Sequence, residues 1–269
     1  MRDYIELIRP FNAIFAGVCT MLGAVLAGDL NVLSIIAALV VFLIAGGGNA
    51  FNDYMDREVD KKLGKKKPIP SGKIKPENAL YFSIALFACG NLVAFFMGKP
   101  YFIFALVVTV LLILYSLFLK KILIVSNVTV ALLGSLVFPF GAMTAGNVRL
   151  STFPFIFAFL LHLPREILKD ALDIEGDKIR GIRSIPQVIG FPKTSLVVKF
   201  ILLLLLLLTP LPYRLYGREY LFAVLFLVDL PILYLSIALF PTEKSFSQSE
   251  KLLKFMMVGG FISLLLGGI

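Results

Sequence analysis

Long apolar runs dominate the chain and restrict it to a membrane fold. Of its 269 residues, 59% are hydrophobic and only 16% are charged, compared with about 25% charged in an ordinary soluble domain. A helix needs about 20 apolar residues to cross roughly 30 Å of hydrocarbon, and the runs are too long and too uniformly apolar for barrel strands. We therefore predict an all-α, polytopic membrane bundle of about nine transmembrane helices. The predicted spans are residues 10–28, 31–51, 78–97, 101–119, 124–146, 152–169, 193–212, 219–239 and 251–268.

The basic residues predict which way this bundle faces. With the N-terminus inside, 22 of the 26 Lys and Arg residues fall in inner segments, in agreement with the positive-inside rule. We therefore expect a multi-pass protein of the cell (plasma) membrane, with a cytoplasmic N-terminus, cytoplasmic basic loops and an outside C-terminus. The net charge of +9 then reflects topology, so membrane lipids are expected partners and nucleic acid is not. No obligate protein partner is evident.

An acidic motif occurs twice, at a constant offset of 117 residues. The first acidic motif is "NAFNDYMDREVDKKLGKK" (residues 49–66), and the second acidic motif is "EILKDALDIEGDKIRGIR" (residues 166–183). Both read D-x-x-D-x-x-x-D-K-x-x-G-x-[KR], so Asp53, Asp56 and Asp60 align with Asp170, Asp173 and Asp177. The repeat predicts one domain (1–269) built from two parallel pseudo-repeats, about 1–121 and 122–240, around a central cavity, with an extra helix at 251–268.

Helical spacing places the acidic side chains of each motif on one narrow face. At 100° per residue, this face holds Asn49, Asp53, Asp56 and Asp60 in the first motif and Glu166, Asp170, Asp173 and Asp177 in the second. Stacked like charges destabilise a helix, so a cation is expected there. Neighbouring lysines are one candidate. A divalent ion is the favoured one, because oxygen ligands without His or Cys suit Mg²⁺ or Ca²⁺.

The spacing of the two motifs also predicts a substrate class. They end spans that are four apart, so both emerge on the same side of the membrane and can face one another across the cavity. Two carboxylate clusters suit two metal ions that bind one diphosphate and neutralise it as it leaves. An apolar bundle interior behind that diphosphate implies an attached lipid tail, as in a polyprenyl diphosphate.

These motifs resemble the paired aspartate-rich motifs of the UbiA superfamily of intramembrane prenyltransferases. "NDYMDREVD" matches the first motif of that superfamily, and "KDALDIEGD" matches the second. The nine spans and the offset agree as well, so the resemblance covers the whole chain. Within the superfamily, "LIRPFNAIFAG", "GGGNAFNDYMDREVD" and "KKPIPSGKI" are most similar to the archaeal digeranylgeranylglyceryl phosphate synthase branch.

The resemblance implies a reaction and a set of site residues. The reaction is Mg²⁺-dependent transfer of a geranylgeranyl group from geranylgeranyl diphosphate to the hydroxyl of geranylgeranylglyceryl phosphate, which forms an ether bond of archaeal membrane lipids. The partners would be an isoprenoid diphosphate donor and a lipid phosphate acceptor. The implied catalytic set is Asp53, Asp56, Asp60, Asp170, Asp173 and Asp177, and the implied metal ligands are Asn49, Asp53, Asp56, Asp170, Asp173 and Asp177.

Several basic and polar residues are candidates for substrate binding. The resemblance assigns Arg9 to phosphate, and it places Tyr115 before a basic pair, although "YSLFLKK" departs by one residue from the spacing expected in the quinone branch. The acceptor carries its own phosphate and needs a second anion site, for which Lys65 to Lys67, Lys73 and Arg183 are candidates, or else positive-inside anchors. The expected substrate-binding residues are Arg9, Asn49, Lys66, Lys67, Tyr115, Lys120, Lys121, Glu166 and Arg183.

Two alternatives remain open at this stage, and a third is disfavoured by the motif. An aromatic prenyltransferase of quinone synthesis would share the donor chemistry, and a cation transporter would use the carboxylates as ion sites. A CDP-alcohol phosphotransferase would require D-G-x-x-A-R, which is absent from the motif. His162 and Asp229 lie in predicted spans and are either structural or functional.

Overall fold

The structure is a computed structural model that describes residues 2–268, and within this range it contains helices and no strands. The helices are α1 (Arg2–Ile8), α2 (Pro10–Leu26), α3 (Val32–Lys62), α4 (Pro76–Met97), α5 (Lys99–Leu117), α6 (Val125–Ser135), α7 (Val137–Thr144), α8 (Thr152–Leu172), α9 (Ile174–Arg180), α10 (Ile185–Leu208), α11 (Tyr213–Val224), α12 (Leu230–Ala238) and α13 (Glu243–Gly268). Short 3-10 turns cover Leu119–Lys121 and Val148–Ser151, and a π-helical turn, Leu225–Asp229, joins α11 to α12.

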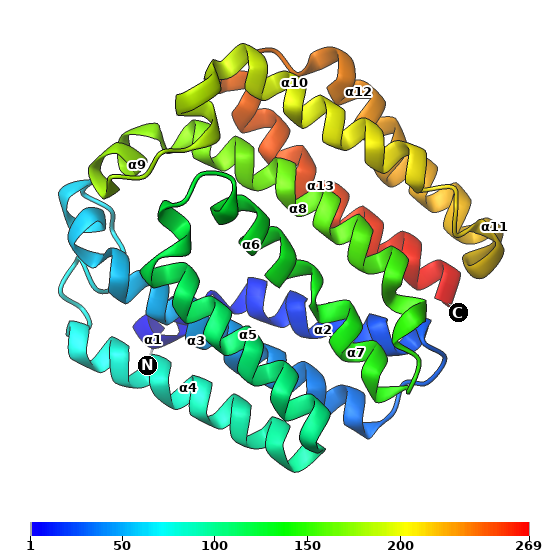
Figure 1. The fold of residues 1–269 in the computed structure, drawn as a ribbon, viewed down its shortest axis with the longest axis horizontal. Helices are drawn as coiled ribbons and strands as arrows, with labels where there is room; N and C mark the ends of the chain where they lie inside the picture. Colours follow the sequence, from blue (N-terminus) through cyan, green and yellow to red (C-terminus); the bar gives the residue numbers. More distant parts are fainter. Residues whose placement is uncertain (1, 269) are drawn as a thin grey trace.

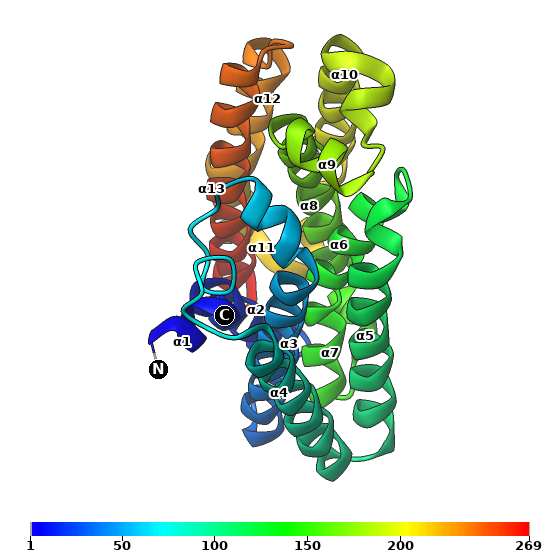
Figure 2. The same ribbon diagram turned by 90° about the vertical axis from the view of Figure 1, so that its left-hand side faces the viewer.

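The long helices run side by side as a membrane bundle (Figures 1 and 2). Seven segments of the described chain are long and apolar enough to cross a membrane: α3, α4, α5, α6 with α7, α10, α11 with α12, and α13. The pair α1 and α2, bent by 50°, is an eighth. A further long helix, α8, packs against α6, α10 and α13. The predicted all-α polytopic fold is confirmed, and about nine spans is consistent with these helices.

Two helices extend well beyond the predicted apolar spans and carry charged turns. The second span was predicted to end at residue 51, and α3 continues beyond it to Lys62, so that the first acidic motif lies on its last turns in the helical conformation that its spacing predicts. The last span was predicted to begin at residue 251, but α13 begins at Glu243. Its polar turns are stabilised by packing: Ser249 and Glu250 are buried, and Glu250 forms an ion pair with Arg165 of α8. Such long-range partners are invisible to a local hydropathy pattern.

The bend between α1 and α2 lies at Arg9. This residue has a left-handed backbone conformation, with φ 51°, which is uncommon for a residue with a side chain. Pro10 follows as the first residue of α2 and fits there because the first N–H groups of a helix have no intrahelical acceptor. The bend directs the Arg9 side chain toward α3, where it reaches the acidic motif.

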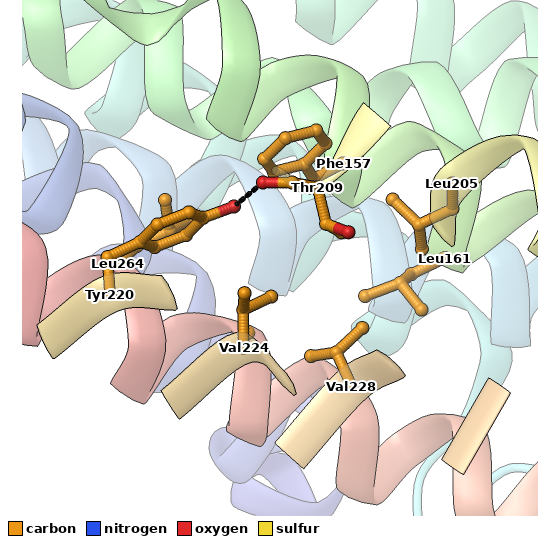
Figure 3. Close-up of a pocket in the computed structure, with 9 residues that line it drawn as sticks. Phe157, Leu161, Leu205, Thr209, Tyr220, Val224, Val228 and Leu264 are labelled. Atoms are coloured by element: carbon orange, nitrogen blue, oxygen red, sulfur yellow. Dashed lines mark hydrogen bonds between the residues drawn. The ribbon is translucent and has the colours of Figure 1, made fainter. Parts of the chain in front are cut away.

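Asp229, the acidic residue predicted within a span, lies in the π-helical turn between α11 and α12. Asp229 is 5% exposed and accepts a hydrogen bond of 3.0 Å from the Thr209 hydroxyl. The Tyr220 hydroxyl donates to the Thr209 carbonyl at 2.7 Å, beside a cavity of about 20 Å³ lined mainly by apolar side chains (Figure 3). Thr209 therefore gives Asp229 the partner that a carboxyl group in a membrane span needs.

Candidate active site

The first acidic motif lies on an unbroken helix, as its periodicity predicts. All residues of α3 from Val32 to Lys62 are helical, so Asn49 and the three aspartates share one face. Asp53 and Asp60 are buried. The glycines that precede the motif allow close packing, because a Cβ on Gly47 would lie 2.9 Å from Phe87 of α4. This packing fixes the acidic end of α3 against its neighbours.

The second acidic motif is divided between two helices, which corrects the prediction of a single acidic helix face. Helix α8 ends at Leu172, Asp173 has a non-helical backbone (φ −117°, ψ 31°), and α9 starts at Ile174. Glu166 and Asp170 therefore lie on α8, whereas Asp177 lies on α9. A Cβ on Gly176 would overlap the Asp173 carboxylate, so this carboxylate folds against the first turn of α9.

The two acidic helix ends lie close enough to share cations. Lys65 Nζ is 3.3 Å from Asp60 Oδ1 and 3.8 Å from Asp173 Oδ2. The Arg180 guanidinium lies 2.8 Å from Asp173, 3.3 Å from Asp177, 3.8 Å from Asp60 and 4.0 Å from Asp56. Carboxylates more than 100 residues apart in the sequence therefore form one electrostatic cluster, at the end of the bundle where α9 meets α3 (Figure 1).

Three predicted basic residues contact the first motif. Arg9 Nη2 and Lys67 Nζ each lie 2.8 Å from Asp53 Oδ1, and Lys67 also lies 2.8 Å from Asp60 Oδ2. Lys120 Nζ lies 2.6 Å from Asp56 Oδ1. Burial alone would lower the pKa of Lys67, but the carboxylates of Asp53 and Asp60 outweigh it and raise that pKa. The lysine is thus held in its charged form.

Other predicted residues are placed elsewhere. Lys66, Lys121 and Arg183 are exposed and form no ion pair with any described residue. Asn49 donates its amide to the Ile8 carbonyl at 3.0 Å, and Glu166 accepts from Lys169 at 2.7 Å. Tyr115 is half-buried and lines the central cavity.

Sequence reasoning missed two residues of the cluster. Arg180 contacts aspartates of both motifs, and Asn127 of α6 donates to Asp170 Oδ2 at 2.7 Å. Arg180 stands at an unmatched position of the repeat, where the first copy has Leu63. Its basic charge, three residues after Asp177, was the available signal. For Asn127, the signal was a polar side chain within an apolar span.

The cluster has the donor atoms that a divalent cation needs. Cations separate the carboxylates, so the described residues contain no ready group of three acidic, His or Cys side chains around one point. Yet Oδ2 of Asp177 is buried and accepts no hydrogen bond, whereas the buried oxygens of Asp60 are paired with Lys65 and Lys67. Burial, and then the charge of Asp173, raise the pKa of Asp177 to about 6. Hard, poorly satisfied anionic oxygens fit Mg²⁺.

A central cavity of about 840 Å³ lies next to the cluster. Arg9, Asn49, Tyr115 and Glu166 are among its polar lining residues. The rest of its wall is mainly aliphatic and aromatic and includes Phe15, Val40, Phe104, Phe138, Phe157, Leu161 and Phe261. This shape suits a molecule with an anionic head and a long apolar tail.

Comparison with known proteins agrees with this geometry. The pattern of the UbiA prenyltransferase family matches residues 14–259. The chain is 35% identical over 273 residues to a digeranylgeranylglyceryl phosphate synthase of Pyrococcus furiosus, covering 100% of this chain and 98% of that protein. It is 34% identical to the enzyme of the same name from Methanosphaera stadtmanae, with 100% of both chains covered.

Solved structures show the same fold. A structure described as digeranylgeranylglyceryl phosphate synthase in membranes has a TM-score of 0.83 and 32% identity, covering 100% of this chain and 98% of that chain. A UbiA homologue from Archaeoglobus fulgidus, bound to GPP and Mg²⁺, has a TM-score of 0.72 and 16% identity, covering 98% of this chain and 99% of that chain. The chain belongs to the UbiA prenyltransferase family and is a multi-pass membrane protein.

Proposed function

We propose that this protein is a digeranylgeranylglyceryl phosphate synthase. It transfers the geranylgeranyl group of geranylgeranyl diphosphate to the hydroxyl of geranylgeranylglyceryl phosphate. The allylic C–O bond to diphosphate breaks, an ether C–O bond forms, and the hydroxyl proton is lost. The observation that carries the proposal is the meeting of two aspartate motifs beside a largely apolar cavity. The full-length similarity to synthases of this name supports the choice of acceptor.

We propose Mg²⁺ as the cofactor, held by Asn49, Asp53, Asp56, Asp170, Asp173 and Asp177. The buried, unsatisfied Oδ2 of Asp177 supports a cation at this cluster. The side-chain N–H of Asn49 donates to the Ile8 carbonyl, so the side-chain oxygen of Asn49 is the atom that would bind the metal. When bound, the metal neutralises the negative charge that develops on the departing diphosphate.

The protein's own residues have distinct roles in this proposal. Arg9, Lys67, Lys120 and Arg180 already bind carboxylates in the cluster and would hold the phosphate oxygens of the donor. The apolar cavity wall would bind the isoprenoid chain and exclude water, which would otherwise capture the allylic cation. Tyr115, between the cluster and this wall, would shield the reacting carbon.

Both motif ends share one backbone geometry, which supports the proposed parallel pseudo-repeats. Gly64 and Gly181 have left-handed φ angles of 63° and 68°. The following N–H groups bond back to the motif in the same way, Lys65 N to the Asp60 carbonyl at 2.9 Å and Ile182 N to the Asp177 carbonyl at 2.8 Å. Each copy thus ends in the same type of helix cap.

The basic residues support an orientation for the cluster. Because 22 of the 26 Lys and Arg residues are predicted on the side of the membrane that holds the acidic motifs, we place the cluster and the N-terminus in the cytoplasm.

A radiolabelled transfer assay on the purified protein tests the proposal. With labelled geranylgeranyl diphosphate and geranylgeranylglyceryl phosphate, we expect a double-chain ether lipid that forms with Mg²⁺ and disappears with a chelator. Asp53→Ala or Asp170→Ala should abolish most of this transfer with the fold intact.

The same assay separates the alternatives. Transfer only to an aromatic acceptor such as 4-hydroxybenzoate would identify an enzyme of quinone synthesis. Cation flux into liposomes without any transfer would support the transporter. Unchanged turnover in either aspartate variant would remove the proposed metal site.

A further inference from the structure

A second group of charged residues lines the central cavity, between α8 and α13. Arg165, Lys169 and Lys254 are all lining residues. Arg165 lies 2.9 Å from Glu250 and 3.2 Å from Glu166. Lys169 lies 2.7 Å from Glu166, and Lys254 lies 3.2 Å from Glu250. Three cations face two carboxylates, which leaves one excess positive charge in this group.

These cations remain available to an anion that enters the cavity. The Arg165 side chain is 18% exposed, and its Nε is buried without a hydrogen-bond partner. Lys169 and Lys254 are about half-exposed, at 47% and 56%. The ion pairs that these three residues form are with the two glutamates, not with an aspartate of either motif. They are therefore not needed to neutralise the aspartate cluster.

The residues predicted from the sequence for a second anion site are not suited to it. Lys67 belongs to the proposed donor site, Lys65 lies between Asp60 and Asp173, and Lys73 lies 3.8 Å from Asp3. Lys66 and Arg183 are exposed, and none of the five lines the cavity. The group on α8 and α13 is better placed.

We propose that Arg165, Lys169 and Lys254 form the site that binds the phosphate monoester of the acceptor lipid. This inference rests on the proposed function, because only a phosphorylated acceptor needs such a site. Arg165 is five residues before Asp170, about 7.5 Å along α8, and Lys169 is next to Asp170. A phosphate held here keeps the hydroxyl of the same short glycerol unit close to the aspartate cluster, while the isoprenoid chain extends along the apolar wall.

Steady-state kinetics with two acceptors test the site. The variant is Lys169→Gln with Lys254→Gln, because both side chains are half-exposed and their loss keeps the Arg165–Glu250 pair. We expect the KM for geranylgeranylglyceryl phosphate to rise roughly tenfold or more, as for the loss of charge-assisted hydrogen bonds. The donor KM should stay within about twofold of the wild-type value, since screening confines the loss to nearby anions. With geranylgeranylglycerol, which lacks the phosphate, variant and wild type should turn over equally.

Matched controls make the result specific. Lys251→Gln removes an exposed charge from the same helix but not from the cavity lining, and its acceptor KM should match that of the wild type. Lys169→Arg with Lys254→Arg keeps both charges and should restore the acceptor KM. Added phosphatidylglycerol should leave the wild-type acceptor KM unchanged, and competition by this lipid would assign the site to bilayer head groups instead.

Two outcomes would overturn the inference. An unchanged acceptor KM in the double Gln variant would show that the phosphate binds elsewhere, and a rise in the donor KM alone would assign these cations to the diphosphate. Both require an active wild-type enzyme. A wild-type protein that does not alkylate geranylgeranylglyceryl phosphate would instead contradict the proposed function, so the two failures are distinguishable.

Discussion

The two acidic motifs share one sequence pattern, but they differ in backbone and in counter-ions. The first lies on the unbroken α3, and its aspartates are neutralised by Arg9, Lys67 and Lys120 from other parts of the chain. The second breaks at Asp173, and its Asp170 accepts from the uncharged amide of Asn127. The first motif is thus largely charge-compensated. In the second, Arg180 pairs with Asp173 and Asp177, but Asp170 keeps a negative charge that an incoming cation would compensate.

Asparagine at Asp53 or Asp170 tests this difference most strongly. Each substitution removes a proposed metal ligand, so we expect transfer to fall on the order of 100-fold or more in both. Without Mg²⁺ their effects on stability should be opposite. Asp53→Asn leaves Arg9 and Lys67 without their shared partner and should lower the unfolding temperature. Asp170→Asn removes a half-buried charge that has only an amide donor, and it should raise that temperature by about 2–4 °C.

The measurement is thermal unfolding in detergent with a chelator present, beside the transfer assay. Asp229→Asn is a suitable control for substitution of a buried carboxyl, because Asp229 lies in the far half of the bundle and pairs with Thr209. Equal changes of unfolding temperature in Asp53→Asn and Asp170→Asn would mean that the two motifs are equally compensated.

Removal of the cations should give the next largest effect and should also differ between the motifs. Arg180→Gln takes away the one guanidinium shared by four carboxylates, so we expect the kcat/KM for the donor to fall about 10-fold to 100-fold. Lys67→Gln should have a smaller effect, because Asp53 keeps Arg9 and Asp60 keeps Lys65. Donor kinetics at saturating Mg²⁺ measure both. An equal or larger loss in Lys67→Gln would contradict this ranking.

Sequence alone predicted the parts of the structure that depend on periodic patterns. Apolar runs of about 20 residues located the spans, and a spacing of 100° per residue correctly placed Asn49 and the first three aspartates on one helix face. The break in the second copy was not predicted, because its defined positions are identical to those of the first. We attribute the break to an undefined position, where Val59 of the first copy corresponds to Gly176 of the second, because a Cβ there would overlap the Asp173 carboxylate.

The counter-ions were harder to predict for a related reason. The repeated basic residues Lys61 and Lys178 are exposed, whereas Lys65, Lys67 and Arg180 contact the carboxylates and have no basic counterpart in the other copy. Which basic side chain contacts the carboxylates depends on the path of the chain around each helix cap. This path is set by tertiary packing rather than by local spacing.

Exchange of Val59 and Gly176 between the two copies tests why the second motif breaks at Asp173. Gly176→Val adds a side chain where even a Cβ overlaps the Asp173 carboxylate. We expect a loss of about 1–3 kcal/mol in stability. Because Asp173 also binds Arg180 at 2.8 Å, transfer should fall severalfold. The reciprocal Val59→Gly weakens a helix by about 1 kcal/mol but moves no carboxylate, so its transfer should stay within about twofold of wild type. Equal activity of both variants would show that the break does not depend on Gly176.

The smallest expected effect is a pH dependence that belongs to the second motif. Burial and the neighbouring Asp173 raise the pKa of Asp177 from 3.8 to about 6. Without metal, the folded protein therefore binds this proton more tightly than the unfolded chain does, and the resulting stabilisation is fully present below about pH 3.8 and lost as the pH rises through about 6. Asp177→Asn should thus gain a few degrees in unfolding temperature over wild type at pH 8 and less at pH 5.

In the loaded enzyme, protons compete with the cation for Asp177, so the Mg²⁺ concentration that gives half-maximal transfer should rise as the pH falls below about 6. A difference between variant and wild type that stays constant from pH 5 to 8 would show that Asp177 does not titrate in this range, and would remove the charge imbalance assigned to the second motif.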